Sequence, residues 1–124
     1  MKVDARFLKG LELFNQKEYF ECHEVIEELW LETPSEDEYR DLYKGVIQAA
    51  AAIYQFDRGI LSGALSLYET AVKYLDLYRP SALGLNVKKL IDELEICFKE
   101  LETCDGKGKI KRRPELTPIL EYTR

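Results

Sequence analysis

The chain has 124 residues, which suits one domain with its own apolar core and is short for two. Its formal net charge of −5 argues against a surface that wraps nucleic acid, because such binding depends on Lys and Arg neutralising phosphates. The three cysteines are odd in number and include no Cys-x-x-Cys pair, which favours reduced thiols in a cytoplasmic protein over a disulfide framework.

Apolar residues recur at helical spacing along nearly the whole chain, and no stretch shows the strict alternation of a half-buried strand. We therefore expect an all-α fold. The first helix is expected to begin after Asp4, a good N-cap residue, and to end near residues 15–17. The second helix is expected over residues 18–32, because the residue before Pro34 avoids the helical region.

Three further helices are expected after Pro34. Ser35 and Glu38 form a capping-box pattern, which predicts that a third helix covers residues 35–57. The fourth helix is expected over residues 61–78 and the fifth over residues 86–104, where apolar residues again keep helical spacing. The expected architecture is a compact bundle of about five helices.

The first four helices form two hairpins that share a residue pattern. Tetratricopeptide hairpins carry a glycine, an alanine, an aromatic residue and a second alanine at fixed spacing, because small residues at a crossing let two helices approach. We expect two such TPR-like hairpins, packed with the fifth helix rather than stacked as a solenoid, which needs more repeats. The matching positions are Gly59, Ala64, Tyr68 and Ala71 in the second hairpin and Lys17, Cys22, Ile26 and Leu29 in the first.

The helices are expected to form a single domain over residues 1–108, followed by a C-terminal tail over residues 109–124. The tail has two prolines and several apolar side chains, so it can dock on the bundle. The basic run at residues 107–113 fits a solvated linker, or a contact with nucleic acid or an acidic partner, and the acidity of the rest of the chain disfavours nucleic acid. The longest apolar-leaning run, residues 46–56, is about half of a bilayer span, so we expect no membrane segment.

The segment around the single histidine is the most informative part of the chain. His23 and Glu27 are four residues apart and Trp30 is three further on, so the three share one stripe of a helix. That stripe lies beside the apolar stripe formed by Cys22 and its neighbours. We therefore expect a partly buried site, where an imidazole and a carboxylate can hydrogen-bond to each other.

Residues 14–30 resemble the domain of unknown function family 309, a group of small all-helical, mostly bacterial proteins. The resemblance rests on an aromatic-Asn turn, Tyr-Phe-Glu, His-Glu, a second Glu and Trp, and it continues through residues 45–48 and 58–64. This chain has Lys17 where the family often has glycine and Gln55 where it often has a second histidine. The resemblance implies an all-α fold and no known activity, and it marks as a shared polar set His23, Glu24, Glu27, Trp30 and Gln48.

Three interpretations of this polar cluster remain open. The first is architectural: His23, Glu27 and Gln48 form a hydrogen-bonded network that joins two helices, since buried polar groups need partners. The second is a His-dependent or metal-dependent hydrolase, although no nucleophile, oxyanion donor or phosphate loop accompanies the histidine. We expect no cofactor and no metal site, because a single histidine leaves only carboxylates and Gln48 as further ligands.

The third interpretation is an interaction surface. Tyr and Trp favour interfaces, and aromatic residues gather on the same helices as the polar cluster. The sequence therefore favours a non-catalytic interaction or scaffold module that forms a homodimer or binds a protein partner, with a hydrolase as the alternative. The residues expected to line its binding surface are Asn15, Tyr19, Phe20, Trp30 and Tyr54.

Overall fold

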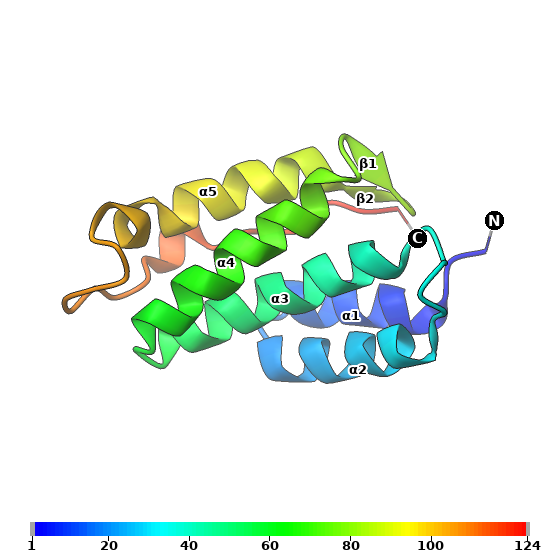
Figure 1. The fold of residues 1–124 in the computed structure, drawn as a ribbon, viewed down its shortest axis with the longest axis horizontal. Helices are drawn as coiled ribbons and strands as arrows, with labels where there is room; N and C mark the ends of the chain where they lie inside the picture. The colour runs from blue at the N-terminus through cyan, green and yellow to red at the C-terminus, as the bar shows by residue number, and fades with distance from the viewer. Residues whose placement is uncertain (1, 124) are drawn as a thin grey trace.

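The computed structural model describes residues 2–123, which fold into five α-helices, one small hairpin of strands and one 3-10 helix (Figure 1). The all-α class and the number of helices are therefore confirmed. In chain order the elements are α1 (Ala5–Asn15), α2 (Tyr19–Glu32), α3 (Arg40–Asp57), α4 (Leu61–Asp76), β1 (Ser81–Ala82), β2 (Leu85–Asn86), α5 (Val87–Thr103) and η1 (Pro114–Leu116).

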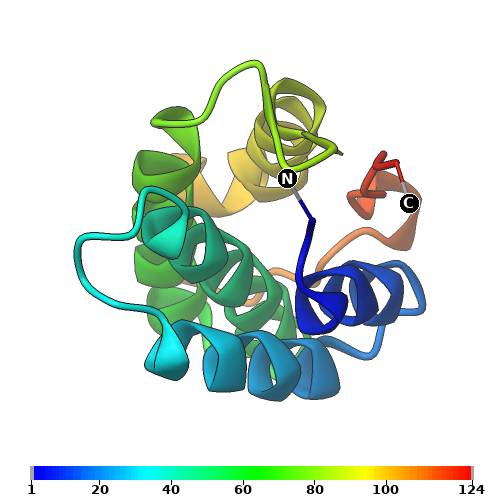
Figure 2. The ribbon, with the colours of Figure 1, turned by 90° about the vertical axis from the view of Figure 1, so that its right-hand side faces the viewer.

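Each helix packs mainly against its neighbours in the chain, and Figure 2 shows the bundle along its length. α3 lies between α2 and α4, and its alanines Ala49, Ala50 and Ala52 are fully buried. Glycines allow the closest approaches: a Cβ at Gly45 of α3 would lie 2.8 Å from the Leu75 side chain of α4. A Cβ at Gly10 of α1 would overlap the Ile26 side chain of α2 in the same way.

The two hairpin turns have the same backbone conformation at their equivalent positions. Lys17, between α1 and α2, has φ +65°, and Gly59, between α3 and α4, has φ +77°. One residue in each turn therefore takes the left-handed conformation that glycine adopts most easily. The paired positions Cys22 and Ala64 are both fully buried. These features agree with the hairpin pattern of the sequence, while kinship to tetratricopeptide repeats stays a prediction.

The predicted start of the third helix is wrong by five residues. Residues 35–39 form turns, and α3 begins at Arg40. The Ser35 hydroxyl donates to the Glu36 carboxylate instead of capping a helix, and the Asp37 carboxylate accepts from the backbone N–H of Tyr39 at 2.8 Å. Short polar side chains that bind nearby backbone groups compete with helix formation, which explains the late start.

The expectation of no strands is also wrong, because α4 ends at Asp76 and a small hairpin follows. β1 and β2 pair in antiparallel fashion around Leu83 and Gly84, whose φ angles are +48° and +82°. Two successive left-handed residues make the tight turn that suits a two-residue hairpin. Strands of two residues are too short to show alternation. Asn86 then caps α5, since its side chain accepts from the backbone N–H of Lys89 at 3.0 Å.

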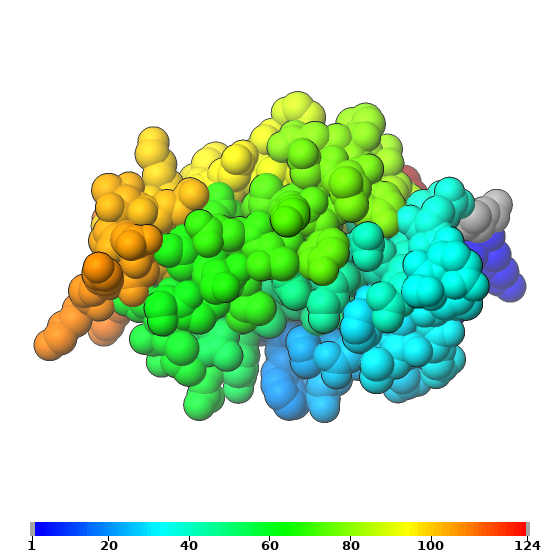
Figure 3. All heavy atoms as spheres, in the orientation of Figure 1, coloured from blue at the N-terminus to red at the C-terminus, as the bar shows by residue number. Residues whose placement is uncertain are grey.

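After α5 the chain projects beyond the end of the helices (Figures 1 and 3). It then turns back along the bundle (Figure 1). The Asn15 amide at the end of α1 donates to the Leu120 carbonyl at 2.9 Å and accepts from the Leu120 N–H at 2.7 Å. Further along, the Thr123 N–H donates to the Gly84 carbonyl at 3.0 Å. The tail therefore lies against the end of α1 and against the β1–β2 hairpin.

Candidate functional site

The candidate site is the groove between α2 and α3, which we call the α2–α3 groove. The core stripe of α2 contains Cys22, Ile26 and Leu29, so the adjoining stripe of the same helix turns toward α3. On α3 the facing stripe follows spacings of three and four residues. The groove combines a pocket beside His23, lined by residues of both helices, with the Trp30 ring of α2, on which two cations of α3 lie. Gln48 lies on α3 between these two parts in the sequence.

His23 and Glu27 lie together as their spacing predicts. His23 Nε2 is 3.5 Å from Glu27 Oε2, and the two side chains are 32% and 41% exposed. At that distance and exposure the pair orients the imidazole more than it stabilises the fold, because surface ion pairs contribute little. Glu24 is exposed on the outer side of α2, away from this pair.

A small pocket of about 170 Å³ opens next to His23. Two aromatic side chains form one wall: the ring centroids of Phe20 and Tyr54 are 5.9 Å apart. Tyr19 is buried, and this burial raises the pKa of its hydroxyl to about 12, so Tyr19 stays protonated at neutral pH. The residues that line the pocket are Tyr19, Phe20, His23, Ala51, Tyr54 and Gln55.

Two cations lie against the indole ring of Trp30 at the other end of the groove. The Arg40 guanidinium carbon and the Lys44 ammonium nitrogen are each 4.2 Å from the ring centroid. Arg40 is also held by a hydrogen bond from Nε to the Thr33 carbonyl at 3.1 Å. Cation–π contacts of this kind fix both cations on the surface of the groove.

Four buried polar side-chain atoms of α2 and α3 lack hydrogen-bond partners within the described residues. They are the Tyr19 hydroxyl, Trp30 Nε1, Gln48 Oε1 and Gln55 Oε1, and within residues 2–123 no other buried side-chain nitrogen or oxygen shares this condition. Leaving such a group unpaired costs about 1–3 kcal/mol, so native proteins satisfy it with water, a ligand or a partner. All four atoms belong to α2 or α3, the two helices that carry the predicted site residues His23, Glu27 and Gln48.

The three-residue network expected from the sequence is formed only in part. His23 and Glu27 meet, but Gln48 Oε1 makes no hydrogen bond to either residue or to any other in residues 2–123. Asn15, expected on the binding surface, instead gives both of its amide atoms to the tail. Sequence reasoning missed Arg40, which reaches Trp30 only because the turn before α3 places it there.

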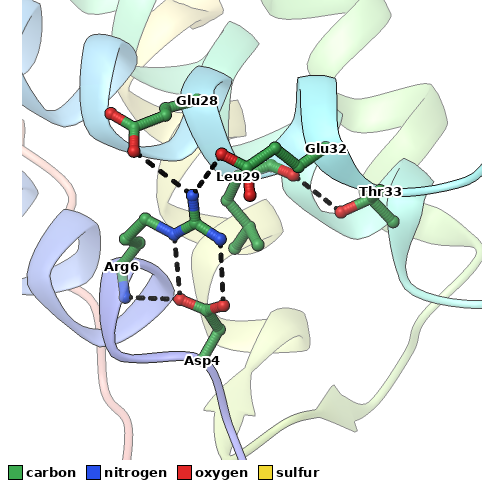
Figure 4. A network of polar contacts seen from close by, with 6 residues as sticks. All are labelled: Asp4, Arg6, Glu28, Leu29, Glu32 and Thr33. Atoms are coloured by element: carbon green, nitrogen blue, oxygen red, sulfur yellow. Dashed lines mark hydrogen bonds and ion pairs between the residues drawn. The ribbon is translucent and has the colours of Figure 1, made fainter.

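The side of α2 that faces α1 is tied to that helix by a charged cluster (Figure 4). The Arg6 guanidinium donates to Asp4, to Glu28 at 3.2 Å and to Glu32 at 2.9 Å. These carboxylates are therefore engaged in holding the first hairpin, which separates them from the groove on the opposite side. Charge-assisted contacts to Asp4 also hold the pKa of its carboxyl below its usual value.

Two classes of feature are absent from the described part of the chain. Residues 2–123 contain no group of three or more His, Cys, Asp or Glu side chains arranged to hold a metal ion. None of the helices in this range is long and apolar enough to cross a membrane.

Comparisons with known proteins place the groove inside a shared segment. Residues 7–67 match the family described as "Domain of unknown function (DUF309)". The chain is 32% identical over 95 residues to "Uncharacterized protein YpuF" from Bacillus subtilis (strain 168), which covers 75% of this chain and 54% of the relative. The chain thus spans about half the length of the curated relative it matches. No solved structure matches the chain.

Proposed function

This chain belongs to the DUF309 family, and on that premise we propose that it is a non-catalytic helical interaction module that forms a homodimer through the α2–α3 groove. The observation that carries the proposal is the gathering of four unpartnered polar atoms on facing helices. A second copy seated on the groove excludes water from the aromatic side chains above these atoms, which strengthens the polar contacts around them.

The charges of this face favour a second copy of the same chain as the partner. α2 presents the carboxylate of Glu27 beside His23, while α3 presents the cations of Arg40 and Lys44 beside Trp30. In a twofold dimer each copy uses the same patch, so a patch with an acidic side and a basic side can pair with itself. Opposite charges then meet across the axis.

Exposed apolar side chains lie on the outer side of α2, next to the groove. Phe20 is 48% exposed and Leu31 is 68% exposed, and their separation of eleven residues places them on one side of the helix. Large exposed apolar groups beside a polar groove are typical of an interface core with a polar surround.

The test compares two charge insertions at leucines of equal exposure. Leu31 and Leu77 are each 68% exposed, but Leu77 lies at the end of α4, outside the groove. Light scattering after size exclusion should report a dimer for the wild type and for Leu77→Glu, and a monomer for Leu31→Glu. A wild-type monomer at high concentration rules the dimer out. Equal behaviour of the two variants rules out the α2–α3 groove as the interface.

A His-dependent hydrolase is the second candidate, because the pocket at His23 has a carboxylate oriented toward its imidazole. In that case His23 acts as a general base on a water held in the pocket. Metal analysis of the wild type and of His23→Ala covers the metal-dependent version. Bound metal that disappears in the variant favours the hydrolase over the interaction module.

We also propose that the chain acts in the cytoplasm, as a protein whose thiols stay reduced. All three cysteines are free, and Cys22 and Cys97 are buried in the core. Burial raises the pKa of the Cys97 thiol to about 11, so these two residues behave as small apolar side chains.

A further inference from the structure

A second cavity, separate from the α2–α3 groove, lies between α5 and the returning chain. Its volume is about 550 Å³, within the range of pockets that hold small ligands. We call it the α5–tail cavity. Its apolar lining comes from the end of α3, from α5 and from the tail, and consists of Phe56, Ile96, Cys97, Cys104, Ile110 and Leu116.

The mouth of this cavity is positively charged although the chain as a whole is acidic. Lys99 of α5 and Lys111 of the tail line it, and both side chains are exposed without an ion pair in the described part of the chain. Arg113 also lines the mouth, and its guanidinium is 3.4 Å from the Glu100 carboxylate. The Glu115 carboxylate also acts on Arg113, so three cations lie against two carboxylates and a net charge of one positive unit remains at the opening.

The wall contributed by the tail is held in place by a largely buried arginine. The Arg112 side chain is 9% exposed, and its guanidinium donates to the Asp57 carboxylate at 2.7 and 3.1 Å. A third bond from Arg112 reaches the Thr117 hydroxyl at 2.5 Å. A bidentate contact of this type fixes the position of Arg112 relative to α3, so the tail forms a defined wall of the cavity.

We propose that the α5–tail cavity binds a single-chain amphipathic anion such as a medium-chain fatty acid. The apolar chain lies against the lining of the cavity, where its burial drives binding. The carboxylate lies at the mouth, where Lys99 and Lys111 offer charge without competing partners. The volume favours one small molecule over a protein segment, which would need a larger contact area.

The test uses decanoate below its micelle concentration, with decanol as the uncharged probe and butyrate as the short one. Isothermal titration calorimetry measures binding, and alkylation of Cys104 by iodoacetamide reports occupancy of the site. Cys104 lines the cavity and is partly exposed, whereas the other two cysteines are buried. Decanoate should bind saturably and slow alkylation of Cys104, and both other probes should bind more weakly.

Paired charge variants locate the head group. Lys99→Gln with Lys111→Gln should weaken decanoate binding about tenfold, because two exposed ion pairs are lost. Lys2→Gln with Lys73→Gln is the matched control, and it should leave binding unchanged. Absence of saturable binding, binding without protection of Cys104, or equal affinity for decanol overturns the proposal. The cavity is formed mainly by α5 and the tail, whereas the proposed dimer forms through α2 and α3. A negative result for decanoate therefore does not affect the dimer proposal.

Discussion

The turn at Lys17 offers the sharpest test of the fold, because one residue there has a left-handed backbone that does not suit its side chain. Lys17 has φ +65°, its side chain is exposed, and it forms no ion pair within residues 2–123. A residue with a Cβ in this conformation loses about 1–2 kcal/mol relative to the right-handed region. Glycine has no such strain, but it increases the conformational entropy of the unfolded chain, which lowers the free energy of unfolding by about 0.4–1 kcal/mol.

Lys17→Gly should therefore raise the free energy of unfolding by about 0.5–1 kcal/mol. For a chain of this length the melting temperature should rise by about 2–5 °C, which is measurable by circular dichroism. Urea denaturation of the same variant gives the free energy, with an unchanged slope as the sign that the transition is still two-state.

Two controls separate the backbone effect from the loss of the lysine side chain. Lys17→Ala keeps a Cβ and should give no gain in stability. Gly59→Ala is the reverse change in the second hairpin: φ is +77° and a Cβ there has nothing within 4 Å, so only backbone strain of about 1 kcal/mol is added. If Lys17→Gly lowers stability, or Lys17→Ala raises it equally, the assignment of strain to this turn is wrong.

Three further predictions concern the packing, the tail and the buried thiol. Gly45→Ala should lower the free energy of unfolding by about 1–3 kcal/mol in urea denaturation, because the added methyl meets Leu75 at 2.8 Å; no loss would show that α3 and α4 can separate. Asp57→Asn should weaken the pairing with Arg112 and increase limited proteolysis of the tail, at a stability loss of about 1 kcal/mol; unchanged cleavage would mean that other contacts hold it. Burial raises the pKa of Cys22 from 9.0 to about 12, so its contribution to stability is complete below pH 9 and is lost as the pH rises toward 12. The stability of Cys22→Ala should fall less over that window, as measured by urea denaturation at each pH.

Much of the local structure was predictable because it depends on residues close together in the chain. Asp4 caps α1 as expected, with its side chain accepting from the backbone N–H of Arg6. The contact of His23 with Glu27 follows from one turn of helix. The late start of α3 was not predictable from the capping-box pattern, since Asp37 binds the backbone of its own turn instead.

The candidate site was only half predictable. Helical spacing placed His23 and Trp30 on one stripe, but it did not indicate which residues of α3 face them. The two cations on the Trp30 ring, and the failure of Gln48 to reach His23, depend on how α2 and α3 cross. A single sequence holds no direct record of that crossing.

By itself, the sequence determined which residues form helices and which face of each helix is apolar, because both depend on spacings of three and four residues. Only the tertiary structure decided which faces meet. The hydrogen bond from Asn15 to Leu120 joins residues that are 105 positions apart. Because of this bond, the Asn15 amide is occupied by the tail and does not contribute to the binding surface that the sequence predicted. Contacts at such separation arise from the packing of whole helices, which local spacing does not encode.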